Sequence, residues 1–109
     1  MAYELSNGSA TITTLAVAED IATVTDAGSF VLAVDMKNLV DDEQFEIVVY
    51  GKSRAGETEQ KIASHGFFGI QGSPVKNFGP FENSNHLKFT IEQINGTKRA
   101  YTWSVMQAR

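Results

Sequence analysis

The stretch EQINGTKRAYTWSV, residues 92–105, joins two arms whose apolar residues all fall at odd positions. An apolar residue at every second position is typical of a β-strand with one buried face. Opposed residues of an antiparallel pair lie on the same face, so two odd-numbered sets share a face only when an odd number of loop residues separates the strands. The stretch therefore predicts two strands that present apolar faces to one core, formed by Leu87, Phe89 and Ile91 before the turn and by Tyr101, Trp103 and Val105 after it.

The turn itself is predicted to be a three-residue loop of residues 94–96. A type I turn followed by a residue in the left-handed region has this odd length, and Gly96 stands where glycine is needed. A two-residue Asn-Gly turn has even length and would send the two apolar sets to opposite faces. The predicted cross-strand pairs are Phe89 with Tyr101 and Leu87 with Trp103.

Alternating apolar residues recur earlier in the chain, in residues 29–36 and 44–52. Residues 10–17 and 21–25 are rich in Thr, Ile and Val, which favour strands, whereas residues 71–85 hold both prolines and predict the longest irregular connection. About seven to eight short strands, with no helix long enough to cover a sheet, predict an all-β fold: a single antiparallel β-sandwich of jelly-roll or immunoglobulin-like topology. The residues predicted to be buried are Phe30, Leu32, Val34, Phe45, Ile47, Val49, Leu87, Phe89, Ile91, Tyr101, Trp103 and Val105.

Length and composition restrict the possible partners. The 109 residues fit one domain, residues 1–109, with residues 1–9 as a polar N-terminal arm. Cysteine is absent, so disulfides, thiolate metal sites and cysteine nucleophiles are excluded. The net charge of -4 argues against nucleic acid, whose phosphates call for a basic stripe. No stretch approaches the roughly 20 apolar residues of a membrane-spanning helix, so we expect neither a nucleic-acid nor a membrane partner.

The chain offers few groups for catalysis. His65 and His86 are its two histidines, and each is interpreted as a strand or loop residue with a local hydrogen bond. Residues 41–43, Asp-Asp-Glu, lack the alternating ligands and the glycine of a calcium loop and are interpreted as a solvated loop. No serine stands in a G-x-S-x-G elbow. We therefore predict a non-enzymatic protein with no catalytic residue, no cofactor and no metal site.

Four phenylalanines, Phe67, Phe68, Phe78 and Phe81, cluster around the glycine- and proline-rich connection instead of alternating along a strand. One interpretation is that they fill an end of the core. The other is that they form an exposed patch that binds another protein. The residues alone leave both interpretations open.

Two segments, VDMKNLVDDEQFEIVVYGKSRAGETEQ and HLKFTIEQINGTKRAYTWSV, resemble a group of small structural proteins of tailed bacteriophages. In that group a core strand leads through a loop with Asn-Leu and acidic residues into F-x-I-x-V-Y-x-K and a glycine turn. A final hairpin carries T-x-x-Q-x-x-G-T-x-R, followed by W-S. Leu87 stands where the pattern has an aromatic residue. The matching residues are Asn38, Leu39, Phe45, Ile47, Val49, Tyr50, Lys52, Gly56, Thr90, Gln93, Gly96, Thr97, Arg99, Trp103 and Ser104.

The resemblance implies a virion component. Such a protein would be a capsid decoration, or cement, protein that binds the major capsid protein on the outer capsid surface after synthesis in the host cytoplasm. It would form a homotrimer, since a closed ring matches a local threefold axis of a shell. The alternatives are a tail- or fibre-associated carbohydrate-binding β-sandwich module, whose sugar would stack on exposed Tyr or Trp, and a small hydrolase. The predicted contact residues are Tyr3, Leu5, Phe67, Phe68, Phe78 and Phe81.

Overall fold

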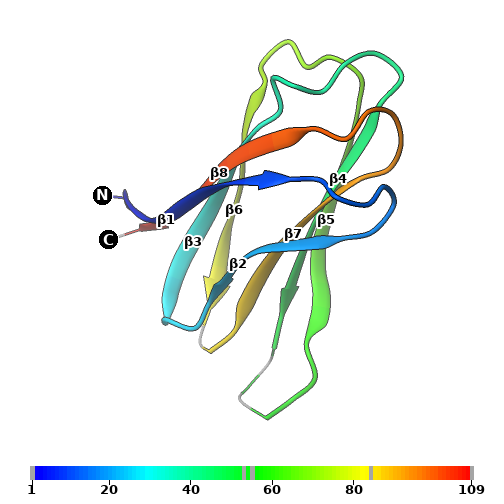
Figure 1. The fold of residues 1–109 in the computed structure, drawn as a ribbon. Coiled ribbons are helices and arrows are strands. Elements are labelled where there is room, and N and C mark those ends of the chain that lie inside the picture. The colour runs from blue at the N-terminus through cyan, green and yellow to red at the C-terminus, as the bar shows by residue number, and fades with distance from the viewer. Residues whose placement is uncertain (1, 53, 55, 84, 109) are drawn as a thin grey trace.

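The computed structural model in Figure 1 describes residues 2–52, 54, 56–83 and 85–108, and for residues 2, 3 and 108 it describes the backbone alone. Within this part of the chain there are eight strands and no helix, which confirms the predicted all-β class. The strands are β1 (Ala2–Thr11), β2 (Glu19–Val24), β3 (Gly28–Asp35), β4 (Gln44–Gly51), β5 (Gln60–Phe68), β6 (Val75–Asn83), β7 (Leu87–Gln93) and β8 (Ala100–Ala108).

The described strands form two four-stranded sheets packed face to face, a β-sandwich as predicted. One sheet has the order β1-β8-β3-β6 and the other β2-β7-β4-β5, and all neighbours are antiparallel. This order is that of a jelly roll, which decides between the two predicted topologies. The two chain ends lie side by side, because Ala2 pairs with Ala108.

The predicted hairpin between β7 and β8 is wrong, because these strands belong to opposite sheets. Phe89 lies opposite Ala22 and Val49, whereas Tyr101 lies opposite Ala10. Residues 94–99 carry the chain from one sheet to the other, so both apolar faces cover the same core from its two sides. The odd-numbered apolar positions correctly predict that both strands face one core. They do not distinguish two strands that pair in one sheet from two strands that face each other across the core.

The predicted core is largely confirmed. Eleven of its twelve predicted residues are at most 1% exposed. The twelfth, Trp103, is half-buried and packs against the core beside Gly8, its neighbour in β1. Further buried apolar residues complete the interior, namely Ile12, Val24, Met36, Leu39 and Phe78.

Two polar segments are strands although neither was predicted to be one. Residues 2–9 are not a free arm, because they pair along β8 as part of β1. The expected irregular stretch 71–85 contains β6, in which a bulge at Gly79 and Pro80 interrupts the pairing with β3. Edge strands need few apolar side chains and tolerate proline at bulges, so composition alone did not reveal them. In contrast, β1 ends at Thr11, inside the stretch 10–17 that was predicted to be a strand.

The connections gather at two ends of the sandwich. We call the end at the upper right of Figure 1 the four-loop end; it carries residues 12–18, 36–43, 69–74 and 94–99. Backbone hydrogen bonds join these loops, among them Ala16 N to Gln93 O at 2.8 Å and Gly69 N to Glu43 O at 2.8 Å. The opposite, three-loop end carries the β2–β3, β4–β5 and β6–β7 connections.

Candidate functional site

Glu43 organises the four-loop end. The residue is 4% exposed, and its carboxylate accepts hydrogen bonds from Arg99 Nε at 2.8 Å and Arg99 Nη2 at 3.0 Å. It also accepts from the backbone N–H groups of Val40 and Thr97. The hydrogen bonds from Arg99, opposed by burial and assisted by the two backbone donors, hold the pKa of Glu43 below its ordinary value. Two loops, residues 36–43 and 94–99, are thereby tied to one buried charge, so the prediction that residues 41–43 form a solvated loop is wrong for Glu43.

Gln93, at the end of β7, is the second buried polar residue of this end. Its amide donates to the carbonyls of Asn95 at 3.0 Å and Thr97 at 2.6 Å. Its side-chain oxygen accepts from the backbone N–H of Arg99 and from the Tyr101 hydroxyl. Burial raises the pKa of Tyr101 to about 12. Because every buried side-chain polar atom in the described residues has a partner, this network stabilises one loop conformation.

Gly96 is required by this network. Its φ of 91° confirms the predicted left-handed glycine. A Cβ placed there would lie 2.5 Å from Glu43 Cγ, well inside van der Waals contact. Gly96, Thr97 and Arg99 thus lie against Glu43, whose burial the sequence did not predict. The sequence signal for this ion pair was a basic residue close to a glycine turn together with an acidic residue on another loop.

Exposed apolar residues also lie at this end of the sandwich. Phe68 and Val75 flank the β5–β6 connection and are 60% and 56% exposed, and Ile70, within the connection, is 65% exposed. Val40 is exposed on the 36–43 loop, which the Gly69–Glu43 hydrogen bond joins to this connection. We call these four residues the apolar rim. Phe68 and Val75 face outward from opposite sheets, because their strand partners Gln44 and Asp35 alternate with buried core residues.

The structure separates the four phenylalanines that the sequence grouped together. Phe68 is exposed, whereas Phe78 is buried and Phe67 and Phe81 are half-buried against the core. The rings of Phe67 and Phe78 meet edge to face at 5.7 Å, and those of Phe81 and Phe89 at 6.0 Å. Both interpretations therefore hold in part, because three of these residues fill an end of the core and Phe68 remains for an interface.

The two predicted contact residues of the N-terminal segment lie elsewhere. Leu5 falls at a bulge of β1 and packs, half-buried, against the core. The side chain of Tyr3 lies outside the described residues. Leu5 is therefore a packing residue and not a free contact, while Ile70 and Val75 are exposed apolar residues that the sequence did not single out.

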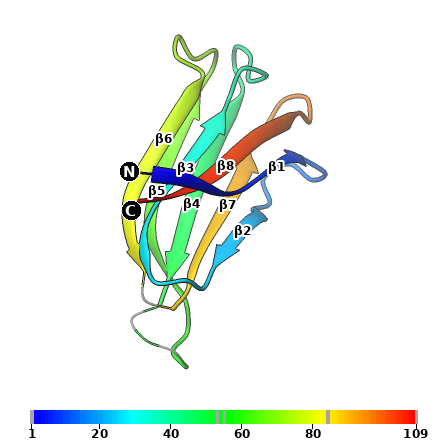
Figure 2. The ribbon, with the colours of Figure 1, turned by 90° about the vertical axis from the view of Figure 1, so that its left-hand side faces the viewer.

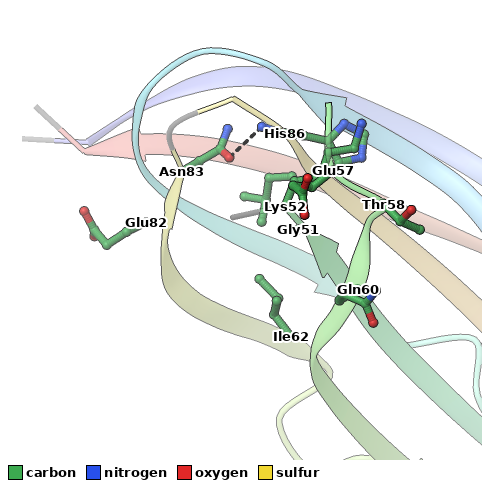
Figure 3. A pocket seen from close by; sticks show the side chains of 10 residues that line it. Gly51, Lys52, Glu57, Thr58, Gln60, Ile62, Glu82, Asn83 and His86 are labelled. Atoms are coloured by element: carbon green, nitrogen blue, oxygen red, sulfur yellow. Dashed lines mark hydrogen bonds between the residues drawn. The ribbon is translucent and has the colours of Figure 1, made fainter. Parts of the chain in front are cut away.

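A hollow of about 540 Å³ opens at the three-loop end (Figure 3). Ile62 and Leu87 contribute its apolar wall, and charged or polar side chains form the remainder. Figure 3 shows the side-chain oxygen of Asn83 accepting a hydrogen bond from the backbone N–H of His86 at 3.0 Å. None of the described lining residues is Phe, Tyr or Trp, so the walls provide no ring for a sugar to stack on.

An ion-pair network lies beside this hollow. Glu59 contacts His86 Nε2 and Lys88 Nζ, each at 2.7 Å, and Lys88 lies over the Tyr50 ring. Hydrogen bonds from Lys88, and then from His86, keep the pKa of Glu59 below its ordinary value, while Glu59 raises the pKa of Lys88. His86 therefore has the local hydrogen bond that was predicted, whereas His65 is exposed and stacks near Phe78 at 5.0 Å. The network holds the β4–β5 connection against β7.

Comparison of the chain with models of protein families, with curated proteins and with solved structures finds no match. The described residues contain neither a helix long and apolar enough to cross a membrane nor a group of three or more potential metal-ligating side chains.

Proposed function

We propose that this chain is a non-enzymatic structural protein of a tailed-bacteriophage virion, a capsid decoration protein that binds the outer surface of the shell. The observation that carries the proposal is the apolar rim of Val40, Phe68, Ile70 and Val75 on the four-loop end. Covering exposed apolar side chains with a partner removes them from water, which favours binding at this end. A rigid, apolar end fits a protein partner better than a small substrate.

The hydrogen-bond network at the same end supports the same proposal. Glu43, Gln93 and Arg99 tie the 36–43 and 94–99 loops together, and the Gly69–Glu43 backbone hydrogen bond joins the β5–β6 connection to them. Docking would therefore cost little loop entropy. The resemblance adds support, because its residues Gln93, Gly96, Thr97 and Arg99 build this network. Jelly rolls occur among viral capsid domains and among lectins, so the fold alone favours neither class.

The proposed partner is the major capsid protein. A ligand that binds the assembled shell, and not its separate subunits, shifts the equilibrium toward the shell. Several copies that bridge neighbouring subunits would act together, so weak single contacts would suffice. The protein would be made in the host cytoplasm and then join the outer surface of the virion. The homotrimer implied by the resemblance stays a prediction.

The test compares shells of the encoding phage with and without the purified protein. We expect the protein to cosediment with shells and to raise the temperature at which they release their contents. Phe68→Asp combined with Ile70→Asp should abolish both effects, because two charges would be buried against the partner. Val17→Asp is the matched control, because Val17 is also 50% exposed but lies on the 12–18 loop, outside the apolar rim.

Two outcomes would refute the proposal. One is a folded wild-type protein that neither binds shells nor changes their heat resistance. The other is equal loss of binding in the double variant and in Val17→Asp. Binding to a glycan array, together with failure to bind shells, would instead support the tail- or fibre-associated carbohydrate-binding module.

A further inference from the structure

The sandwich has four edge strands in the described chain, and three of them are protected against pairing with another molecule. β2 has six residues, and a bulge between Asp20 and Ala22 interrupts it. β1 is bulged between Glu4 and Ser6, and β6 contains the bulge at Gly79 and Pro80. Short length, bulges, charges and proline are the devices that prevent edge-to-edge association.

The fourth edge, β5, lacks these devices over most of its length. Its residues Ala63–Phe68 pair with β4 in one unbroken register, and no strand covers their other side in the described chain. This segment contains neither proline nor a fully charged residue. β5 lies at one side of the sandwich with β6, away from β1 and β2 (Figure 2). Such an edge presents free backbone donors and acceptors to a further strand.

We propose that β5 pairs with β5 of a second copy of this chain, in antiparallel orientation about a twofold axis centred on Ser64. A twofold axis normal to the sheet leaves the outer face of both copies on the same side of the joined sheet. Outward-facing residues of one β5 must therefore lie opposite outward-facing residues of the other. Centring the axis on Ser64 meets this condition and sets Ala63 opposite His65. The same register sets Gly66 opposite the bulged residues Lys61 and Ile62 of the second copy.

In this register, Lys61 of one copy can reach Glu46 of the other through the open space over Gly66. On the outer face, Gly66 lies beside Glu46 of β4, and nothing lies within 4 Å of the position where a Cβ would be. Lys61 of the second copy would extend over this glycine toward the Glu46 carboxylate, two strand spacings or roughly 10 Å across the sheet, within reach of the two side chains together. In the described residues, neither Glu46 nor Lys61 has an ion-pair partner within its own chain. The register therefore supplies two equivalent ion pairs to one dimer.

This inference does not rest on the proposed function. A twofold pairing closes with two copies, whereas the trimer implied by the resemblance needs another contact. Measurement of the mass in solution decides between them. A decoration protein can be monomeric, dimeric or trimeric. If the dimer is not found, the proposed shell binding is therefore still tested separately by the cosedimentation experiment.

The experiment measures the mass of the full chain by sedimentation equilibrium over a range of concentrations, at low and high salt. We expect a monomer–dimer equilibrium that weakens as salt rises, since exposed ion pairs are screened. Lys61→Glu or Glu46→Lys alone should weaken the dimer at least about tenfold by placing like charges together. The double variant should restore the dimer, because it exchanges the two charges. Lys37→Glu, an exposed lysine on the 36–43 loop, is the control and should leave the equilibrium unchanged.

Gly66→Lys provides a second test that does not depend on folding defects. The new side chain has open space in the monomer, but it would occupy the route of Lys61 and repel it. We expect a folded monomer with an unchanged circular dichroism spectrum. A wild-type protein that stays monomeric at all concentrations, a trimer, or a dimer indifferent to these charge changes would overturn the proposal.

Discussion

Single residues at the four-loop end determine how the loops are held. Glu43 and Gln93 are buried polar groups whose hydrogen bonds are all made to loop backbones, to Arg99 or to Tyr101. Removing one partner of such a network leaves another group buried and unsatisfied, which costs more than the bond itself contributes. These residues are therefore expected to control stability more than their small number suggests.

Glu43→Gln should change the response of stability to acid. Hydrogen bonds from Arg99 lower the pKa of Glu43 in the folded state, so its contribution is full above the unfolded pKa of about 4.3 and is lost as the pH falls through the lower folded value. Denaturant unfolding at pH 7 and pH 3 should show a smaller acid-induced loss for the variant, which is also less stable by about 2–3 kcal/mol at pH 7. Glu57→Gln, in an exposed pair, is the control. Equal acid loss in wild type and Glu43→Gln would contradict this assignment.

Gly96→Ala should lower the free energy of unfolding by more than the left-handed backbone conformation of residue 96 alone explains. A left-handed φ costs a residue with a Cβ roughly 1 kcal/mol. At Gly96 the added methyl group would also overlap Glu43, so we expect a total of more than about 2 kcal/mol in the free energy of unfolding. Gly56→Ala is a matched control, because Gly56 has nearly the same φ, 89°, with nothing within 4 Å of its Cβ position. If the two variants lose equal stability, the proposed overlap with Glu43 is unimportant.

At the scale of the strands, alternation in the sequence predicts faces better than it predicts neighbours. The odd-numbered residues of β7 and β8 face the core as expected, since burial selects one face of a strand. Their pairing could not be predicted, because the loop of residues 94–99 is held by Glu43 on a distant part of the chain. β1 and β6 were missed for a related reason: an edge strand gains stability from its backbone bonds to one neighbour and shows little apolar alternation.

Gly8→Val tests how β1 packs on β8. A Cβ at Gly8 would lie 2.9 Å from the Trp103 ring, so a larger side chain must displace that ring toward solvent. Trp103 is the chain's single tryptophan, and we therefore expect its fluorescence to shift to longer wavelength with a loss of stability of roughly 1–3 kcal/mol. Gly72→Val, at a position with open space around it, should leave the emission unchanged. An unshifted spectrum for Gly8→Val would show that β1 does not cover Trp103.

At the scale of the whole molecule, the jelly-roll order brings four distant loops to one end. Phe68 was predicted as a contact residue because aromatic residues gather near it in the sequence, and the structure exposes it. Ile70 and Val75 were not predicted, because single apolar residues in a glycine-rich segment give no periodic signal. Glu43 was missed because its burial depends on Arg99, 56 residues later in the chain. Sequence reasoning therefore identified the core and part of the candidate surface, but not the network that supports that surface.

We propose that the apolar rim, at the end of the sandwich that the Glu43 network holds together, is the surface that meets the capsid protein. The most direct measurement places a photo-crosslinking amino acid at position 68, or at position 17 as a control, and irradiates the protein bound to shells of the encoding phage. We predict crosslinks to the major capsid protein from position 68 and few from position 17, with both variants bound to the shells. Bound protein that crosslinks from position 17 and not from position 68 would contradict the account.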